Sequence, residues 1–488
     1  MTGETVDTGK RRRHVGLVLG PVLFVLLLVL PVPEGMSPEA MKVAAVTVLM
    51  ATFWITEAIP IPATALFPIA LFPLLAVLPT AKVTAAYGNH LIYLFLGGFF
   101  IAMAIERWQL HRRIALHTVR VVGTTPDRVV LGFMLATAFL SAWISNTATA
   151  MIMVTIALAV LRQVSGVAEG DDLKPTRFGA TLMLGIAYAA SIGGVATLIG
   201  TPPNAILAGV VEQRYGIEIG FAHWMAFGVP LSLLMLAVAW FYLTRFVKGE
   251  VSADAFFGRE VLHRELAALG PMTVQERRVL VVFGAVVAAW LTRGAIDYAP
   301  LRFITDSSVA ITGAVLLFII PSGRGGGEPL LDWASAVRIP WDIIILFGGG
   351  FALAAGFAAS GLTEWMGAQL AFLEGTPLWV TVLAAVTLVI FLTEVTSNTA
   401  TASLLLPVLA GFAMAMNIHP MFLMVAAALS ASFAFMLPVA TPPNAIAFSS
   451  RQFSIPEMAR AGVWMNLVGM AVITLFVTLL LPLVWTLD

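Results

Sequence analysis

Long apolar windows separated by short polar segments follow one another along almost the whole chain. A helix that spans a bilayer needs about 20 predominantly apolar residues. Windows of that order lie near 15–33, 43–59, 62–79, 90–106, 178–211, 225–244, 279–296, 304–321, 343–360, 421–449 and 462–485. This pattern predicts an all-α polytopic membrane protein with eleven transmembrane helices.

Two further apolar windows, 129–161 and 378–415, are longer than one span requires, and each contains a Ser-Asn-Thr cluster near its middle. Non-helical backbone at membrane depth must be buried in protein or line a cavity, because lipid offers it no hydrogen bonds. We therefore expect both windows to form re-entrant hairpins, the first entering from the cytoplasm and the second from outside.

The composition narrows the class of protein. Charged residues make up 11% of the 488 residues, against about 25% in a typical soluble protein. A net charge of zero without a basic stripe argues against nucleic acid as a partner. The chain has no cysteine, which excludes disulfides and thiolate metal sites. It also has no Ser/His/Asp set, phosphate loop or HExxH sequence, so we do not expect an enzyme.

The distribution of cations predicts the orientation. Lys and Arg occupy all of 10–13 and recur in 107–128 and 245–278, whereas 339–450 contains neither. Because cytoplasmic segments carry the excess of Lys and Arg, we expect a cytoplasmic N-terminus and an external C-terminus. The expected location is the cell membrane, inner or plasma, crossed several times.

Three short segments recur in the same order, at offsets of 252, 252 and 240 residues. The pairs are GGF at 97–99 and 349–351, SNTATA at 145–150 and 397–402, and TPPNAI at 201–206 and 441–446. The basic segment 107–128 corresponds to 361–377, which contains Glu364 and Glu374 and no cation. Opposite charge indicates opposite sides of the membrane, so we expect two inverted repeats, as in many secondary transporters.

These observations predict the domain organisation. We expect a cytoplasmic tail at 1–14, a first transmembrane helix with an outer loop at 15–42, a first repeat at 43–250 containing the inner hairpin, a cytoplasmic linker at 251–278, and a second repeat at 279–488 containing the outer hairpin.

The Ser-Asn-Thr clusters supply hydroxyl, amide and carbonyl oxygens that suit sodium, together with amide, hydroxyl and backbone donors that suit an oxyanion. The tandem prolines of each TPPN segment must break a helix, at Gly200–Thr201 and at Ala440–Thr441. A single cluster is equally well explained by capping or helix packing, and a single break by a proline kink. Their duplication favours a binding site.

Neither cluster and neither break contains Lys or Arg. Carrying a dianion into a cell at about −100 mV costs roughly 4.6 kcal/mol, at about 2.3 per charge. Two co-transported sodium ions would cancel this cost, and a third would let the potential assist. Glu394, three positions before Ser397, has two interpretations: it tunes a cation site, or it supports the hairpin through hydrogen bonds.

The duplicated motifs, together with 192–201 (IGGVATLIGT) and 431–444 (ASFAFMLPVATPPN), resemble the divalent anion/sodium symporter family over essentially 15–487. Ala447 departs from the family pattern, which usually has Val there. The resemblance implies a homodimer of eleven-helix protomers. Each protomer would have a scaffold domain and a transport domain that moves as an elevator.

The resemblance also implies the site residues. The first sodium site is similar to one formed by Ser141, Ser145, Asn146 and the Gly200 carbonyl. The second is similar to one formed by Thr393, the Thr396 carbonyl, Asn398 and the Ala440 carbonyl. The substrate would touch Asn146, Thr147, Thr201, Asn398, Thr399 and Thr441.

We therefore expect sodium-coupled symport of C4-dicarboxylates such as succinate, fumarate or malate into the cell. The alternatives are a sodium-independent dicarboxylate exchanger of the same fold and a transporter of sulfate or citrate. The expected partners are a small dianion, sodium, the bilayer and a second protomer.

Overall fold

The computed structural model describes residues 2–123, 125–167, 173–245, 258–293, 303–323, 327–369 and 375–485. Across these ranges the regular structure is helical, and the β pairing is one isolated bridge between Pro321 and Pro329. The predicted all-α class is therefore confirmed for the described residues. The predicted linker 251–278 and the window 279–296 lie partly outside them.

The helices up to the linker include both partners of the first hairpin. They are α1 (Thr2–Val29), α2 (Pro38–Thr56), α3 (Ile61–Thr64), α4 (Phe67–Leu74), α5 (Thr80–Ala86), α6 (His90–Arg107), α7 (Leu110–Val122), α8 (Pro126–Ser141), α9 (Asn146–Ser165), α10 (Arg177–Gly194), α11 (Pro202–Tyr215) and α12 (Phe221–Arg245).

The later helices include both partners of the second hairpin. They are α13 (Gly258–Leu269), α14 (Val274–Thr292), α15 (Asp306–Ile319), α16 (Trp333–Ala336), α17 (Trp341–Ser360), α18 (Leu362–Gln369), α19 (Leu378–Thr393), α20 (Asn398–Ala415), α21 (Met421–Ala431), α22 (Pro442–Ser449), α23 (Ile455–Leu479) and α24 (Leu481–Val484).

Eight helical segments of the described chain are long and apolar enough to cross a membrane. They are Lys10–Val29, Pro38–Thr56, Thr80–Arg107, Asn146–Ser165, Phe221–Arg245, Trp341–Ser360, Asn398–Ala415 and Ile455–Leu479. A multi-pass membrane protein is thus confirmed. Several other predicted windows are divided into shorter helices, as 178–211 is into α10 and α11 and 421–449 into α21 and α22. The number eleven stays a prediction.

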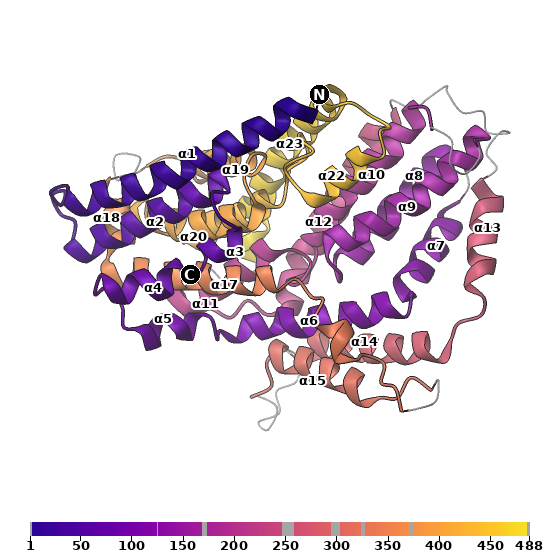
Figure 1. Cartoon of the computed structure of the whole chain (residues 1–488), viewed down its shortest axis with the longest axis horizontal. Helices are drawn as coiled ribbons and strands as arrows, with labels where there is room; N and C mark the ends of the chain where they lie inside the picture. Colours follow the sequence, from indigo (N-terminus) through magenta and orange to yellow (C-terminus); the bar gives the residue numbers. More distant parts are fainter. Residues whose placement is uncertain are drawn as a thin grey trace.

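The broken helices connect the two halves of the chain. Helix α10 packs against α8 and α9 of its own half, and also against α22 of the other half. Helix α22 in turn contacts α9, while α11 contacts α20 and α21. Figure 1 shows α8, α9 and α10 side by side, with α22 beside α10. Each break therefore lies between helices of both halves.

The repeated Gly-Gly pair lets α6 and α17 each pack closely against a neighbouring segment. A Cβ on Gly97 would lie 2.6 Å from the Ala310 carbonyl carbon of α15, and one on Gly349 would lie 2.6 Å from the Ala65 side chain. Helix α6 packs against α15 along the lower edge of Figure 1. A side chain at either glycine would force these elements apart, which gives the GGF repeat a packing role.

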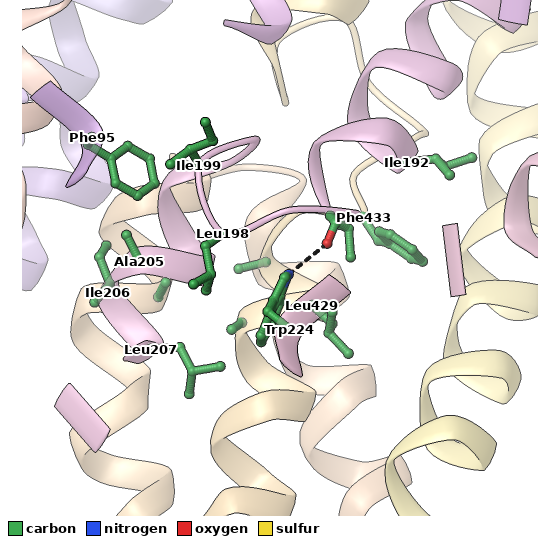
Figure 2. Packing of buried hydrophobic residues seen from close by; sticks show 14 of the residues in the cluster. Phe95, Ile192, Leu198, Ile199, Ala205, Ile206, Leu207, Trp224, Leu429 and Phe433 are labelled. Atoms are coloured by element: carbon green, nitrogen blue, oxygen red, sulfur yellow. Dashed lines mark hydrogen bonds between the residues drawn. The ribbon is translucent and has the colours of Figure 1, made fainter. Parts of the chain in front are cut away.

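A buried cluster surrounds the break between α10 and α11. Leu198, Ile206 and Trp224 are each no more than 1% exposed. The Trp224 indole Nε1 donates to the Val195 carbonyl at 3.0 Å, which Figure 2 marks with a dashed line. Apolar packing and this hydrogen bond together fix the first non-helical residue after α10.

Candidate cation and anion site

The tip of the first hairpin is a four-residue break between α8 and α9. Helix α8 ends at Ser141 and α9 begins at Asn146. The Ser141 hydroxyl lies 2.5 Å from Asn146 Oδ1 and 2.6 Å from the Ala190 carbonyl of α10. Three oxygens therefore meet around one hydroxyl proton, which can serve only one acceptor at a time. A cation would satisfy the excess lone pairs.

Two glycines bring the neighbouring break onto this cluster. A Cβ on Gly194 would lie 3.0 Å from the Asn146 amide atoms and 3.0 Å from the Gly200 carbonyl oxygen. A Cβ on Gly200 would lie 2.4 Å from the Gly194 carbonyl oxygen. The absence of both side chains thus lets the Asn146 amide and the Gly200 carbonyl approach the same point. Three of the four predicted ligands of the first sodium site, Ser141, Asn146 and Gly200, come together there.

The second hairpin has the same arrangement. Helix α19 ends at Thr393 and α20 begins at Asn398. The Thr393 hydroxyl lies 2.7 Å from Asn398 Oδ1 and 2.9 Å from the Ala431 carbonyl of α21. The Thr396 hydroxyl bonds to the Leu392 carbonyl and to the Thr401 hydroxyl, at 2.7 and 2.6 Å. The oxygen cluster is therefore duplicated at the offset of 252 residues.

Both helix breaks are longer than the prolines alone predict. Helices α10 and α21 end at Gly194 and Ala431, six to nine residues before the predicted positions. The reason is a side chain: Asn204 Nδ2 donates to the Gly194 and Thr197 carbonyls at 3.4 and 2.8 Å. Asn444 Nδ2 does the same for Ala434 and Leu437, at 2.9 and 3.0 Å. These amides hold carbonyls that a helix would otherwise satisfy.

The starts of α9, α11 and α20 carry no side-chain cap. Their N-cap residues are Ser145, Thr201 and Ser397, and none accepts a hydrogen bond from its own helix. By contrast, Thr441 accepts from the Asn444 N–H at 3.3 Å. At α9 and α20 the uncapped starts leave first-turn N–H groups available, with a partial positive charge that favours an anion. The start of α11 offers no such groups, because Pro202 and Pro203 lack an N–H and the Asn204 N–H donates to the Thr201 carbonyl at 3.2 Å. This arrangement can bind an oxyanion without Lys or Arg.

The predicted substrate residues lie on these helix starts. Thr147 and Thr399 each follow the first residue of α9 and α20, and Thr399 is buried. The Thr201 hydroxyl lies 3.3 Å from the Ser432 hydroxyl, so the two breaks meet. Ser145 directly precedes α9 and Ala440 lies two residues before α22, and the Ser145 hydroxyl accepts no hydrogen bond from its own helix.

Three functional features escaped the sequence reasoning. The Ala190 and Ala431 carbonyls complete the oxygen clusters, and Gly194 makes room for Asn146. Nothing in an apolar helix marks one carbonyl as a ligand. Glu394, in contrast, was visible in the sequence. At the repeat offset of 252 residues its counterpart is the uncharged Ala142, so the carboxylate occurs in one half only.

Glu394 is buried and accepts four hydrogen bonds. The Phe435, Met436 and Leu437 N–H groups donate to its carboxylate at 2.8, 2.9 and 3.1 Å, and Asn466 Nδ2 of α23 donates at 2.8 Å. Of its two predicted interpretations, the hydrogen-bonded support is therefore present.

The family of this chain follows from its similarity to known proteins. The model of the sodium:sulfate symporter transmembrane region matches residues 11–486. The chain belongs to the divalent anion/sodium symporter family. This confirms the resemblance drawn from the motifs.

Individual members of the divalent anion/sodium symporter family are similar over nearly the whole chain. The sodium-dependent dicarboxylate transporter SdcS of Staphylococcus saprophyticus is 45% identical over 480 residues, covering 97% of this chain and 92% of the relative. The protein of the same name from Staphylococcus aureus strain USA300 is 43% identical with the same coverage.

Two solved transporter structures share the fold of this divalent anion/sodium symporter family member. The Alcanivorax borkumensis YdaH transporter has a TM-score of 0.57 and 15% identity, covering 83% of this chain and 89% of its own. Neisseria gonorrhoeae MtrF has a TM-score of 0.57 and 14% identity, covering 95% of both chains. At these identities the likeness concerns the fold alone.

Proposed function

We propose that the protein is a sodium-coupled importer of C4-dicarboxylates such as succinate, fumarate or malate. The observation that carries the proposal is the duplicated oxygen cluster beside uncapped helix starts, with no basic side chain among the site residues. The SdcS relatives, named as sodium-dependent dicarboxylate transporters, support the same function.

Sodium occupies two sites in this proposal. Ser141, Ser145, Asn146 and the Gly200 carbonyl bind the first ion, and Thr393, Asn398 and the carbonyls of Thr396 and Ala440 bind the second. Both hydroxyl clusters have more oxygen lone pairs than protons, which supports cation binding.

The dicarboxylate lies between the two clusters. One carboxylate contacts the start of α9 at Asn146 and Thr147, and the other contacts the start of α20 at Asn398 and Thr399. The uncapped N–H groups and the bound sodium ions offset its two charges, because no Lys or Arg is there to do so. Thr201 and Thr441 close the site from the two breaks.

Movement follows an elevator mechanism in a homodimer of eleven-helix protomers. In this proposal α8–α9 and α19–α20 are the re-entrant hairpins of the transport domain, and the N-terminus is cytoplasmic. Sodium binding organises both hairpin tips before the anion arrives, which couples the two fluxes.

Uptake of radiolabelled succinate into proteoliposomes tests this function. Uptake should require an inward sodium gradient and should be inhibited by fumarate and malate. Stimulation by internal dicarboxylate without sodium would indicate an exchanger, and stronger inhibition by sulfate or citrate would indicate another substrate. Asn146→Ala and Asn398→Ala should each abolish uptake while retaining the wild-type elution volume in size-exclusion chromatography; normal uptake by both would refute the site.

A further inference from the structure

The two halves of the site differ in charge at one equivalent pair of positions. In the first half, Ala142 follows the last residue of α8, and its carbonyl accepts from the Thr197 hydroxyl at 2.5 Å. That hydroxyl also accepts from the Gly200 N–H at 3.1 Å. The first hairpin tip and the first break are thus joined by neutral groups.

In the second half the same connection is made by a carboxylate. Glu394 stands 252 residues after Ala142, and Leu437 stands 240 residues after Thr197, which are the offsets of the repeat. Glu394 accepts from Leu437 and from the two residues before it. Leu437 in turn accepts from the Ala440 N–H at 3.2 Å. Glu394 therefore fixes the turn that presents the Ala440 carbonyl.

Glu394 only accepts hydrogen bonds, on both side-chain oxygens, as an ionised carboxylate does, and it is buried without a cationic partner in the described chain. The residue is 3% exposed, and within the described chain no Lys, Arg or His forms an ion pair with it. Its hydrogen-bond donors are neutral amides, which stabilise an anion without cancelling its charge. A buried unpaired charge is costly unless a cation lies nearby.

The residue that carries this carboxylate is the chain neighbour of a residue in the second oxygen cluster. Thr393, whose hydroxyl contacts Asn398 Oδ1, directly precedes Glu394 in the chain. In a weakly polarisable interior, a negative charge several ångströms from a cation site raises its affinity strongly.

We propose that Glu394 is a positioning residue that makes the two cation sites unequal. It orients the Ala440 carbonyl through the 435–437 backbone, and its charge raises the affinity of the second site for an alkali cation. The first site lacks this charge because Ala142 stands at the equivalent position. The inference rests on the proposed function and goes beyond it.

Succinate uptake measured against sodium concentration tests the proposal. Glu394→Gln retains the size of the side chain and removes the charge, so the sodium concentration for half-maximal uptake should rise at least about ten-fold. At saturating sodium, its succinate KM should remain within about two-fold of wild type, because only cation binding is weakened. Glu394→Asp, which restores the charge, should recover part of the sodium affinity. The control is Glu39→Gln, on the exposed first turn of α2.

The outcomes separate this proposal from the proposed function. If wild-type uptake ignores sodium, the function itself is wrong. If wild-type uptake needs sodium and Glu394→Gln keeps the wild-type half-saturation value, only the role of Glu394 is refuted.

A second variant covers the case in which Glu394→Gln does not fold. Asn466→Ala removes one donor but keeps the carboxylate and its three backbone partners. Its sodium half-saturation should stay within about two-fold of wild type. A ten-fold rise would show that hydrogen-bond geometry rather than charge sets the affinity, and would overturn the proposal.

Discussion

Gly200→Ala tests the first cation site through a single methyl group. The backbone of Gly200 is not in the left-handed region, so alanine meets no conformational penalty there. The penalty is steric, because the new Cβ would lie 2.4 Å from the Gly194 carbonyl oxygen. The position of a Cβ is fixed by its own backbone and the oxygen is a backbone atom, so no side-chain rotation can relieve the contact.

The structure gives the size of the effect. An ordinary contact of this kind is about 3.4 Å, so the backbone at Gly200 and the backbone at Gly194 must separate by about 1 Å. Overpacking of this kind costs about 1–3 kcal/mol. A separation of this size displaces the Gly200 carbonyl, a proposed sodium ligand, relative to Asn146. If the bound state bears that cost, the sodium half-saturation value rises by about 5- to 140-fold, since each 1.4 kcal/mol is ten-fold.

The assay is sodium-dependent succinate uptake into proteoliposomes, with Gly284→Ala as the matched control. Gly284 lies within α14, and a Cβ there would contact nothing within 4 Å. The control should therefore transport normally and gain about 0.5–1 kcal/mol of helix stability. A wild-type sodium half-saturation value in correctly folded Gly200→Ala would refute the role of the Gly200 carbonyl.

Three further changes test other parts of the structure. Thr393→Val removes a proposed ligand of the second sodium ion and should raise the sodium half-saturation value about ten-fold in the uptake assay, with little change in succinate KM at saturating sodium. Trp224→Phe leaves the buried Val195 carbonyl without its donor and should lower the free energy of unfolding by about 1–2 kcal/mol, seen as a lower thermal unfolding temperature. The third change is Glu276→Gln, in the first turn of α14. Burial raises the pKa of Glu276, but hydrogen bonds from Arg113 and from the backbone of the N-cap Thr273 outweigh it and leave this pKa lower than the usual 4.5. Its contribution is therefore complete above pH 4.5 and is lost as the pH falls through the lower folded-state value, so the difference in unfolding temperature between wild type and Glu276→Gln should shrink in acid.

Apolar periodicity and proline chemistry predicted much of the helical framework. The Ser-Asn-Thr clusters mark the starts of α9 and α20, because Asn146 and Asn398 are the first residues of these helices. Residues 201–206 and 441–446 were correctly expected to interrupt helices. What remained hidden was the extent of each interruption, since the residues after Gly194 and Ala431 are as apolar as a helix.

The cause of those longer interruptions is tertiary. The side chains of Asn204 and Asn444 each donate to two carbonyls, one ten residues and one seven residues earlier in the chain. Local helix propensity does not encode such contacts. Likewise, Gly194 resembles any helical glycine until the fold brings Asn146 against it. Pattern reasoning finds the motifs but not the contacts that give them their geometry.

The proposed role of Glu394 predicts that the two halves share motifs but differ in cation affinity. The hydroxyl clusters at Ser141 and Thr393 use equivalent atoms, so geometry alone would make the sites alike. The charge enters at a single position, Glu394, three residues before the repeated hexapeptide, where the other half has Ala142. Because a buried charge acts over several ångströms whereas hydrogen bonds act at contact, that single position can alter one site without changing any of its ligands. A difference in sodium affinity between the halves should therefore respond to substitutions at position 394, even though the ligand motifs themselves are unchanged.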